Sequence, residues 1–257
     1  MTMSQSSLST TRRNFLHGAG ALTLAWSLRA DDVAAQSHAS SFAPNVWLTI
    51  APDGTITIMS PAAEMGQGTM TALPVIIAEE LDADWNKVRV VPAPLDAKKY
   101  GNPYYGNSLA YASSMTVSAY FKPLRLVGAQ ARRVLMQAAA DKLNVPLAEL
   151  VTEPSVIVHK ASGRRMSYGE VAGFARAPET LPEIADADLK TFASFRLIGK
   201  DMPRVDIPAK TNGEARYAMD ARVPGMIYGA ELQCPWHGGA PDQIDDAQAR
   251  KMPGVID

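Results

Sequence analysis

The sequence predicts an α+β protein. Three patterns carry that prediction: two short runs of alternating β-forming residues, a helical pattern at residues 69–81 directly after them, and a longer helical pattern at about 115–143. The composition is ordinary for a globular protein, since 47% of the 257 residues are hydrophobic, 20% are charged and the formal net charge is −1. It excludes a disordered tail, a collagen-like repeat and a strongly basic nucleic-acid binder, because no excess positive field is present to hold phosphates.

The first expected elements are the two strands of a hairpin. Residues 46–50 and 55–59 alternate β-forming side chains, and the Pro-Asp-Gly segment at residues 52–54 has the composition of a tight turn. A helix follows at 69–81, where large apolar residues recur at helical spacing. Residues 88–91 are expected to form another short strand, which completes a first group of strands and helix.

The long helix follows a loop rich in Tyr, Asn and Gly at residues 99–111. One face of this helix is apolar, and we expect it to end before Pro146, because proline cannot continue a helix. A strand at 156–158 and a helix at 168–175 come next. Ser167 is the expected N-cap of that helix, with a glutamate three residues later at the capping-box position.

The pattern changes after residues 177–194, which carry prolines and acids and are expected to be a linker. Before the linker, residues 36–176 form the first expected unit. After it, residues 195–257 are expected to form a β-rich unit, with strands at 213–217 and 226–232. The strand pattern of this second unit is still in progress when the sequence stops.

Residues 1–35 have the character of a targeting segment. Arg12 and Arg13 precede a mildly apolar stretch at residues 18–28, and small residues follow at 33–35. The apolar stretch is well short of the roughly 20 residues that cross a bilayer. The segment resembles a twin-arginine export signal, which implies a periplasmic protein that acquires a complex cofactor before export. The alternative is an arginine pair that opens an ordinary amphipathic helix.

Gly66, Gln67 and Gly68 lie between a strand and a helix, where they could form an anion cradle. Glycines let the backbone approach a ligand closely, and the free N–H groups of a helix start point toward negative charge. Gln67 adds a side chain that both donates and accepts hydrogen bonds. The spacing is neither that of a P-loop nor that of a dinucleotide-binding fingerprint. A tight turn that only caps the helix is the alternative.

A second polar segment opens the long helix, at Ala112, Ser113, Ser114 and Thr116. Hydroxyl groups at a helix start serve equally as helix caps and as ligands for phosphate or pterin groups. Because two consecutive strand–helix units begin with such segments, the two together suggest one shared anionic ligand. Capping remains the simpler interpretation of the second segment taken alone.

The other reactive residue types give no catalytic or metal site. Cys234 is the single cysteine, which excludes a disulfide or a Cys-based metal centre within the chain, and we expect it to be a small buried residue. His159 and His237 are expected to be packed or surface residues rather than metal ligands. Four arginines are expected on solvated faces: Arg132, Arg133, Arg164 and Arg165. No nucleophile–base set can be assembled.

Two motifs nevertheless carry a resemblance. Residues 64–69, Glu-Met-Gly-Gln-Gly-Thr, and the helix that continues into residues 77–81 resemble a molybdopterin-binding segment of xanthine dehydrogenase-type large subunits. Residues 204–217, 223–229 and 252–255 resemble the start of that family's α/β-hammerhead domain. Their order after an export signal is similar to the periplasmic branch, which holds isoquinoline 1-oxidoreductase β subunits and the large subunits of membrane-bound aldehyde dehydrogenases.

The resemblance implies a molybdenum hydroxylase that oxidises aldehydes or hydroxylates N-heteroaromatic rings. Its cofactor is a molybdenum-bearing molybdopterin, often the cytosine dinucleotide, and its electrons leave through a small iron–sulfur subunit and commonly a cytochrome c subunit. Mapped onto this chain, two sets of residues would bind the cofactor. They are Gly66, Gln67 and Gly68 beside the metal group, and Ala112, Ser113, Ser114 and Thr116 at the pterin phosphates.

This sequence also departs from the family pattern. The family's general-base glutamate lies near the C-terminus of a much longer subunit, so no catalytic residue is expected here, and Glu64 should not be taken as that base. We therefore expect the chain to be an N-terminal portion of the large subunit that does not turn over alone. The alternatives are a non-catalytic truncated fragment or interaction module, and an exported binding protein for an organic anion.

Overall fold

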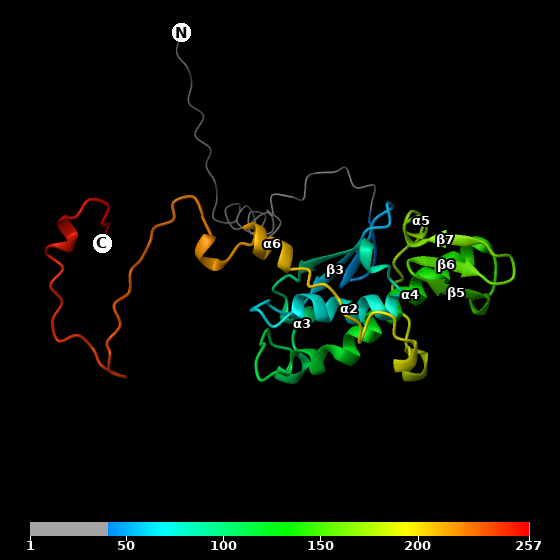
Figure 1. Ribbon diagram of the computed structural model, residues 1–257, viewed down its shortest axis with the longest axis horizontal. Helices are drawn as coiled ribbons and strands as arrows, with labels where there is room; N and C mark the ends of the chain where they lie inside the picture. The colour runs from blue at the N-terminus through cyan, green and yellow to red at the C-terminus, as the bar shows by residue number, and fades with distance from the viewer. Residues whose placement is uncertain (1–40, 257) are drawn as a thin grey trace, which may run out of the picture. The chain divides into compact units, whose positions relative to one another are not determined.

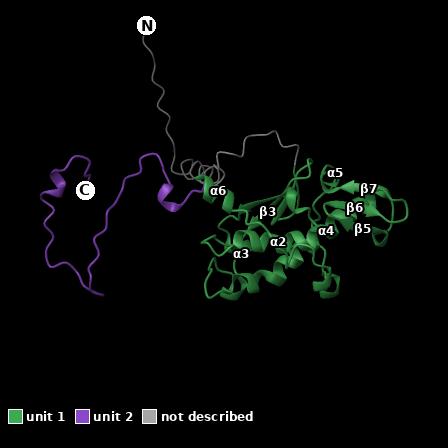
Figure 2. Cartoon of the chain, in the orientation of Figure 1, with its two compact units in different colours: residues 1–213 green, residues 214–257 purple. Residues whose placement is uncertain are grey.

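The computed structural model describes residues 41–256, so the expected export signal at 1–35 lies outside the described residues. The chain divides into two compact units after Gly213, coloured separately in Figure 2. The α-helices and the two sheets all belong to the first unit. The described residues of the expected first unit, 36–176, therefore contain both helices and strands, as an α+β fold requires.

A four-stranded sheet forms the centre of the first unit (Figure 1). Its strands lie in the order β1 (Phe42–Asn45), β2 (Leu48–Ile50), β3 (Ile56–Ser60) and β4 (Val88–Pro92). The first three are antiparallel and β4 runs parallel to β3, as the helix between them allows. The expected hairpin and the strand at 88–91 are confirmed, whereas β1 was not expected.

Two helices pack on this sheet, α2 (Thr69–Leu81) and α4 (Thr116–Leu143). Both expected helices are confirmed. Asn144 ends α4 in the left-handed conformation, two residues before the proline that the sequence suggested as the stop. The fully buried side chains of the core come from this sheet, from both helices, and from the smaller sheet and short helix that follow them in the chain: Leu48, Ile50, Ile56, Ile58, Leu73, Ile77, Leu81, Tyr120, Leu124, Leu135, Ile157 and Tyr168.

The helices α2 and α4 run in the same direction and approach each other closely at Gly128. A Cβ atom on Gly128 would lie 2.3 Å from the carbonyl oxygen of Ile77 and 2.9 Å from Cβ of Glu80. Further toward the helix starts, Val117 and Thr71 line one groove. The two N-terminal ends therefore lie at the same end of the helix pair.

A smaller antiparallel sheet follows α4. Its strands are β5 (Leu150–Glu153), β6 (Val156–His159) and β7 (Arg165–Ser167), of which only β6 was expected. The short helix α5 (Tyr168–Ala172) begins with the expected capping box, in which Ser167 and Glu170 each bond the other's backbone N–H. The buried Tyr168 hydroxyl donates to the carbonyl of Leu81 at 2.6 Å, which joins the start of α5 to the end of α2.

Two further short helices are α3 (Ala97–Tyr100) and α6 (Ile207–Asn212). Single turns of 3₁₀ helix lie at Trp85–Lys87, Pro103–Tyr105, Leu147–Glu149, Asp186–Asp188, Phe192–Ser194, Ala218–Asp220 and Ala249–Lys251. Within the described part of the chain, no helix is long and apolar enough to cross a membrane.

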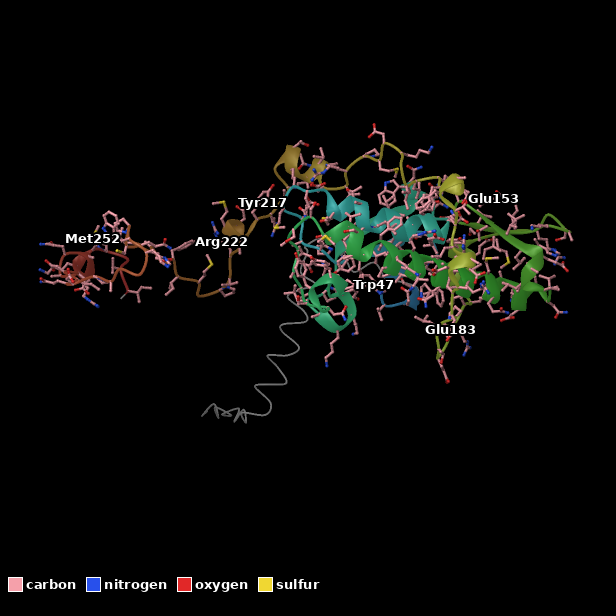
Figure 3. All side chains as sticks on the ribbon, turned by 90° about the horizontal axis from the view of Figure 1, so that it is seen from below. Trp47, Glu153, Glu183, Tyr217, Arg222 and Met252 are labelled. Carbon is pink, nitrogen blue, oxygen red and sulfur yellow. The ribbon has the colours of Figure 1, made fainter. Side chains whose placement is uncertain are left out.

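The second unit, residues 214–256, contains no strand in its described residues, so the strands expected at 213–217 and 226–232 are wrong. A strand is stable only when its N–H and C=O groups pair with another strand, and here none is paired. Ile227, Leu232 and Cys234 are exposed as a result, which also corrects the expectation that the cysteine is buried. Figure 3 shows Tyr217, Arg222 and Met252 along this part of the chain.

We predict that Gly128→Ala destabilises the first unit by about 1–3 kcal/mol, because the new methyl group would meet the backbone of α2. Helix propensity alone predicts the opposite sign, a gain of about 1 kcal/mol for alanine over glycine. Urea unfolding followed by circular dichroism measures the difference. Gly229→Ala is the control, since a Cβ there has no neighbour within 4 Å. A Gly128→Ala chain as stable as the unsubstituted chain would contradict the close packing.

Candidate cofactor-binding site

The loop before α2 depends on two glycines in the left-handed region. Gly66 has φ 107° and Gly68, the N-cap of α2, has φ 86°. Side chains other than hydrogen are strained at such angles, so this backbone path requires glycine. A Cβ atom on Gly66 would have no neighbour within 4 Å, so the space beside this glycine is open.

The expected anion cradle is present, but a side chain of the loop itself occupies its donors. The Glu64 carboxylate accepts hydrogen bonds from the N–H groups of Gly66 at 2.8 Å, Gly68 at 3.0 Å and Met70 at 3.0 Å. The first free N–H groups of α2 are thereby satisfied within the loop. The helix start carries an anion already, and that anion belongs to the chain.

The Gln67 amide is also held within the loop. Its Nε2 donates to the carbonyl of Ala63 at 2.7 Å and to Oγ1 of Thr69 at 2.8 Å, and its Oε1 accepts from the N–H of Met65 at 2.6 Å. Both amide hydrogens are therefore in use, whereas Oε1 keeps one lone pair. The residue is exposed, so this oxygen is the part of Gln67 that a ligand could meet without disturbing the loop.

Arg204, from a distant part of the sequence, closes the loop. Its Nη1 donates to the carbonyl of Gly66 at 3.0 Å, and its Nη2 lies 3.2 Å from Oε1 of Glu64. The same guanidinium pairs with Asp206 at 2.7 Å, and Lys210 pairs with Asp206 at 2.6 Å. Glu64, Arg204, Asp206 and Lys210 thus form a chain of ion pairs of alternating charge that begins at the loop.

Hydrogen bonding keeps these carboxylates ionised. Burial raises the pKa of Glu64, but the N–H groups of Gly68, Met70 and Gly66 together lower it by more, so the pKa lies below its ordinary value of 4.5. The hydrogen bond from Arg204 holds the pKa of Asp206 far below its usual range. Both groups are negative at neutral pH.

The start of α4, unlike that of α2, has no side chain within residues 41–256 that accepts hydrogen bonds from its first N–H groups. Ser113 and Ser114 lie in consecutive left-handed positions, with φ 52° and 57°, and both are exposed. Among the described residues neither hydroxyl has a hydrogen-bond partner, and Met115, the N-cap of α4, offers no side-chain cap. The interpretation of these serines as helix caps is wrong, because Met115 is the N-cap of α4 and no described side chain caps its first N–H groups. Their hydroxyls are free to bind a ligand.

The remaining residues of the second segment are less open. Thr116, the first residue of α4, is buried, and the Ala112 carbonyl accepts a hydrogen bond from Met115 at 3.1 Å. Ala112 is exposed, so its surface is available to a ligand.

One groove of about 420 Å³ joins the two helix starts. Gly68 and Thr71 line it from α2, Val117 and Phe121 from α4, and residues 197–204 from a third segment. Of the expected site residues, Gly68 lines this groove, and the second expected segment, residues 112–116, directly precedes Val117. Its lining is apolar apart from Thr71 and the charged residues Lys200, Asp201 and Arg204.

The third segment, residues 189–205, is called the strap. Two fully buried carboxylates of α2 hold it. Glu79 Oε2 accepts from the backbone N–H groups of Arg196 at 2.8 Å, Leu197 at 2.5 Å and Ile198 at 3.1 Å, while Oε1 accepts from Nζ of Lys190 at 2.9 Å. The start of the strap overlaps the segment expected as a linker.

The neighbouring Glu80 takes part in the same anchorage. Its carboxylate accepts from Nε of Arg125 at 2.8 Å and from the backbone N–H of Lys190 at 3.2 Å. Arg132 lies 3.4 Å from Asp82, and its side chain is only 18% exposed. This corrects the expectation of a solvated Arg132, since α4 presents it to the acidic end of α2.

Sequence reasoning missed Glu64, Glu79 and Arg204 as parts of the site. An acid two residues before a left-handed glycine is a local signal that could have indicated Glu64. No local signal could indicate Arg204, since its partners lie 138 and 140 residues away.

The other candidates lie elsewhere or carry no site. The ring of His159 is buried, with Nδ1 2.7 Å from Oγ of Ser162 and Nε2 2.7 Å from Glu149, so the packed interpretation is confirmed. His237 is exposed in the second unit. Within residues 41–256, no group of three or more His, Cys, Asp and Glu side chains could hold a metal ion.

A family model described as a molybdopterin cofactor-binding domain matches residues 9–219. The chain belongs to this family. The match includes both helix starts and the strap, and the resemblance to molybdopterin-dependent large subunits is confirmed.

Three curated relatives are similar to this chain. It is 40% identical over 280 residues to the beta subunit of isoquinoline 1-oxidoreductase from Brevundimonas diminuta, covering 95% of this chain and 36% of the relative. It is 36% identical to a membrane-bound aldehyde dehydrogenase (pyrroloquinoline-quinone) of Gluconacetobacter polyoxogenes, covering 84% and 27%, and 30% identical to a subunit of nicotinate dehydrogenase from Pseudomonas putida KT2440, covering 82% and 18%. The chain therefore spans about a third or less of these relatives.

We predict that Glu79→Gln weakens the first unit by about 3 kcal/mol at neutral pH, because it leaves Lys190 and the strap N–H groups without their buried anion. Burial raises the pKa of Glu79, but Lys190 and the strap lower it by more, below 4.5. Its stabilisation is therefore present above the ordinary pKa and lost as pH falls through the folded-state pKa.

Urea unfolding at a series of pH values tests this expectation. Acidification from pH 7 should cost the unsubstituted chain more stability than the Glu79→Gln chain. Glu153→Gln is the matched control, since Glu153 pairs with Arg165 at an exposed position, and it should change stability little. Parallel pH curves for the unsubstituted chain and Glu79→Gln would show that the buried carboxylate does not hold the strap.

Proposed function

We propose that this chain forms one wall of a molybdopterin cofactor site in a molybdenum hydroxylase. The proposed reaction is the oxidation of aldehydes to carboxylic acids or the hydroxylation of N-heteroaromatic rings. The observation that carries the proposal is the pair of helix starts on one groove, in a chain whose family is the molybdopterin cofactor-binding domain. The relatives support the activity proposed for the whole enzyme: the chain is 40% identical to the beta subunit of isoquinoline 1-oxidoreductase and covers 36% of that subunit.

The residues at the two helix starts fit such a group in different ways. Ser113 and Ser114 present free hydroxyls beside the uncapped start of α4, which suits a phosphate. The N–H groups of Gly66 and Gly68 are held by Glu64. Gly66 would therefore meet the cofactor through the open space beside it, whereas a Cβ on Gly68 would face the Arg204 guanidinium at 3.9 Å. Gln67 would accept a hydrogen bond through Oε1.

When bound, the molybdenum-bearing pterin supplies the redox and oxygen-transfer chemistry. The described residues would bind and orient it. Glu64 does not serve as the general base, because its carboxylate accepts three N–H groups, pairs with Arg204 and has a lowered pKa. We assign the general base to another part of the large subunit, and turnover to the assembled enzyme rather than to this chain alone.

The proposal also covers the form of the cofactor, the partner subunits, the export route and the domain that follows, and these parts rest on the resemblance of the sequence to the family. We propose the cytosine dinucleotide form of the cofactor, a small iron–sulfur subunit as electron acceptor and, after it, a cytochrome c subunit. The Arg12-Arg13 segment supports export to the periplasm by the twin-arginine route. Residues 204–255 would correspond to the start of an α/β-hammerhead domain. Two of the relatives are named as subunits, which supports partner chains.

We predict that Ser113→Ala combined with Ser114→Ala lowers cofactor retention by about 10–100-fold in affinity, because two hydrogen bonds to a charged group are lost. The chain is co-produced with its enzyme partners and the cofactor pathway. Molybdenum is then measured by mass spectrometry, and the pterin by the fluorescence of its oxidised product.

Ser118→Ala is the matched control on the same helix, since its hydroxyl already donates to the carbonyl of Met115 at 3.2 Å. It should leave retention unchanged. Equal retention by the double variant and the unsubstituted chain would remove the α4 start from the site. An unsubstituted chain that never carries molybdenum or pterin would instead favour a non-catalytic module.

A further inference from the structure

We infer that Glu64 is a built-in anion and the positioning residue of the candidate site. Its carboxylate occupies the cradle that the two glycines create, fixes the path of the loop that carries Gln67, and keeps other anions away from the start of α2. The role of Glu64 in holding the loop follows from the hydrogen bonds of its own carboxylate. Only the identity of the ligand rests on the proposed function.

The first support is the convergence of donors on one side chain. The N–H groups of Gly66 and Gly68 share Oε1, and the N–H of Met70 donates to Oε2 at 3.0 Å. The Glu64 side chain is only 9% exposed, although the residues around it are largely open to solvent. A carboxylate in this place replaces the anion that a helix start would otherwise attract.

The second support is the counter-charge. Arg204 contacts both the Glu64 carboxylate and the Gly66 carbonyl, so one guanidinium holds the anion and the loop backbone together. Arg204 is itself fixed by Asp206 at 2.7 Å. Because Arg204 lies on the strap, the loop is tied to the segment that Glu79 anchors on α2.

The third support is the difference between the two helix starts. At α2 the N–H groups of Gly68, Met70 and Thr71 have acceptors and a negative charge is in place, so a second anion would meet like charge there. At α4 the hydroxyls of Ser113 and Ser114 have no partner among the described residues. The arrangement directs an oxyanion of the ligand to the start of α4 and leaves the uncharged edge at Gly66 and Gln67 for the rest of the ligand.

The test uses the full chain without cofactor and follows backbone amides by ¹H–¹⁵N NMR during titration with acetate. In Glu64→Ala the emptied cradle should take up acetate, with saturating shifts at Gly66, Gly68 and Met70 and an affinity at least about tenfold above that of the unsubstituted chain. Glu64→Gln should not bind acetate, because its amide still fills the cradle. Glu170→Ala, which removes the carboxylate that bonds the N–H of Ser167 at α5, is the matched control and should leave the three amides unmoved.

A second measurement needs no substitution. In the unsubstituted chain, the amides of Gly66, Gly68 and Met70 should follow one common titration with a midpoint below 4.5, absent in Glu64→Gln. It decides the matter even where Glu64→Ala does not fold. Acetate shifts of equal size in the unsubstituted chain, or amides that titrate without a common midpoint, would overturn the inference.

Both measurements are independent of molybdenum and pterin. Acetate uptake by Glu64→Ala in a chain that never retains the cofactor would overturn the proposed function and leave the role of Glu64 standing. Cofactor retention through Ser113 and Ser114 without the acetate response would do the reverse.

Discussion

The close approach of α2 and α4 at Gly128 determines where the other parts of the first unit lie. Because the helices run in the same direction, their N-terminal ends meet on one groove, and the C-terminal end of α2, with the acidic residues that hold the strap, meets the middle of α4. The strap then returns along α2 to deliver Arg204 to the loop beside Gly68. A side chain at position 128 would meet the Ile77 carbonyl, so the close contact of the two helices depends on glycine there.

Two carboxylates, each accepting hydrogen bonds from three backbone N–H groups, hold the loop before α2 and the strap in place. Glu79 gathers three N–H groups of the strap and Glu64 gathers three of the loop, so each uses one side chain to satisfy backbone groups that no strand or helix pairs. Ionised acceptors make stronger hydrogen bonds than neutral ones, which explains why irregular backbone holds its path here. Both carboxylates stabilise the site, and neither is placed to act as a base.

Local patterns predicted the elements whose causes are local. The helices α2 and α4, the hairpin and the capping box at Ser167 follow from periodicity, turn composition and cap spacing. Strands β1, β5 and β7 are three or four residues long and exist through pairing, so no local pattern indicated them. At residues 226–232 the local pattern predicted a strand, but no other described strand pairs with this segment and no strand forms. In the site, the glycines and serines were evident, but Arg204 reaches Glu64 only through the fold.

The central claim is that both helix starts face one cofactor. The most direct measurement is a crystal structure of the loaded enzyme, with anomalous scattering recorded at the molybdenum edge and the phosphorus positions read from the density. The account predicts a molybdenum peak beside Gln67, a phosphate against Ser113 and Ser114, and a Glu64 carboxylate still bonded to the loop N–H groups. A phosphate at the start of α2, with Glu64 displaced, or a molybdenum peak remote from both helix starts, would contradict it.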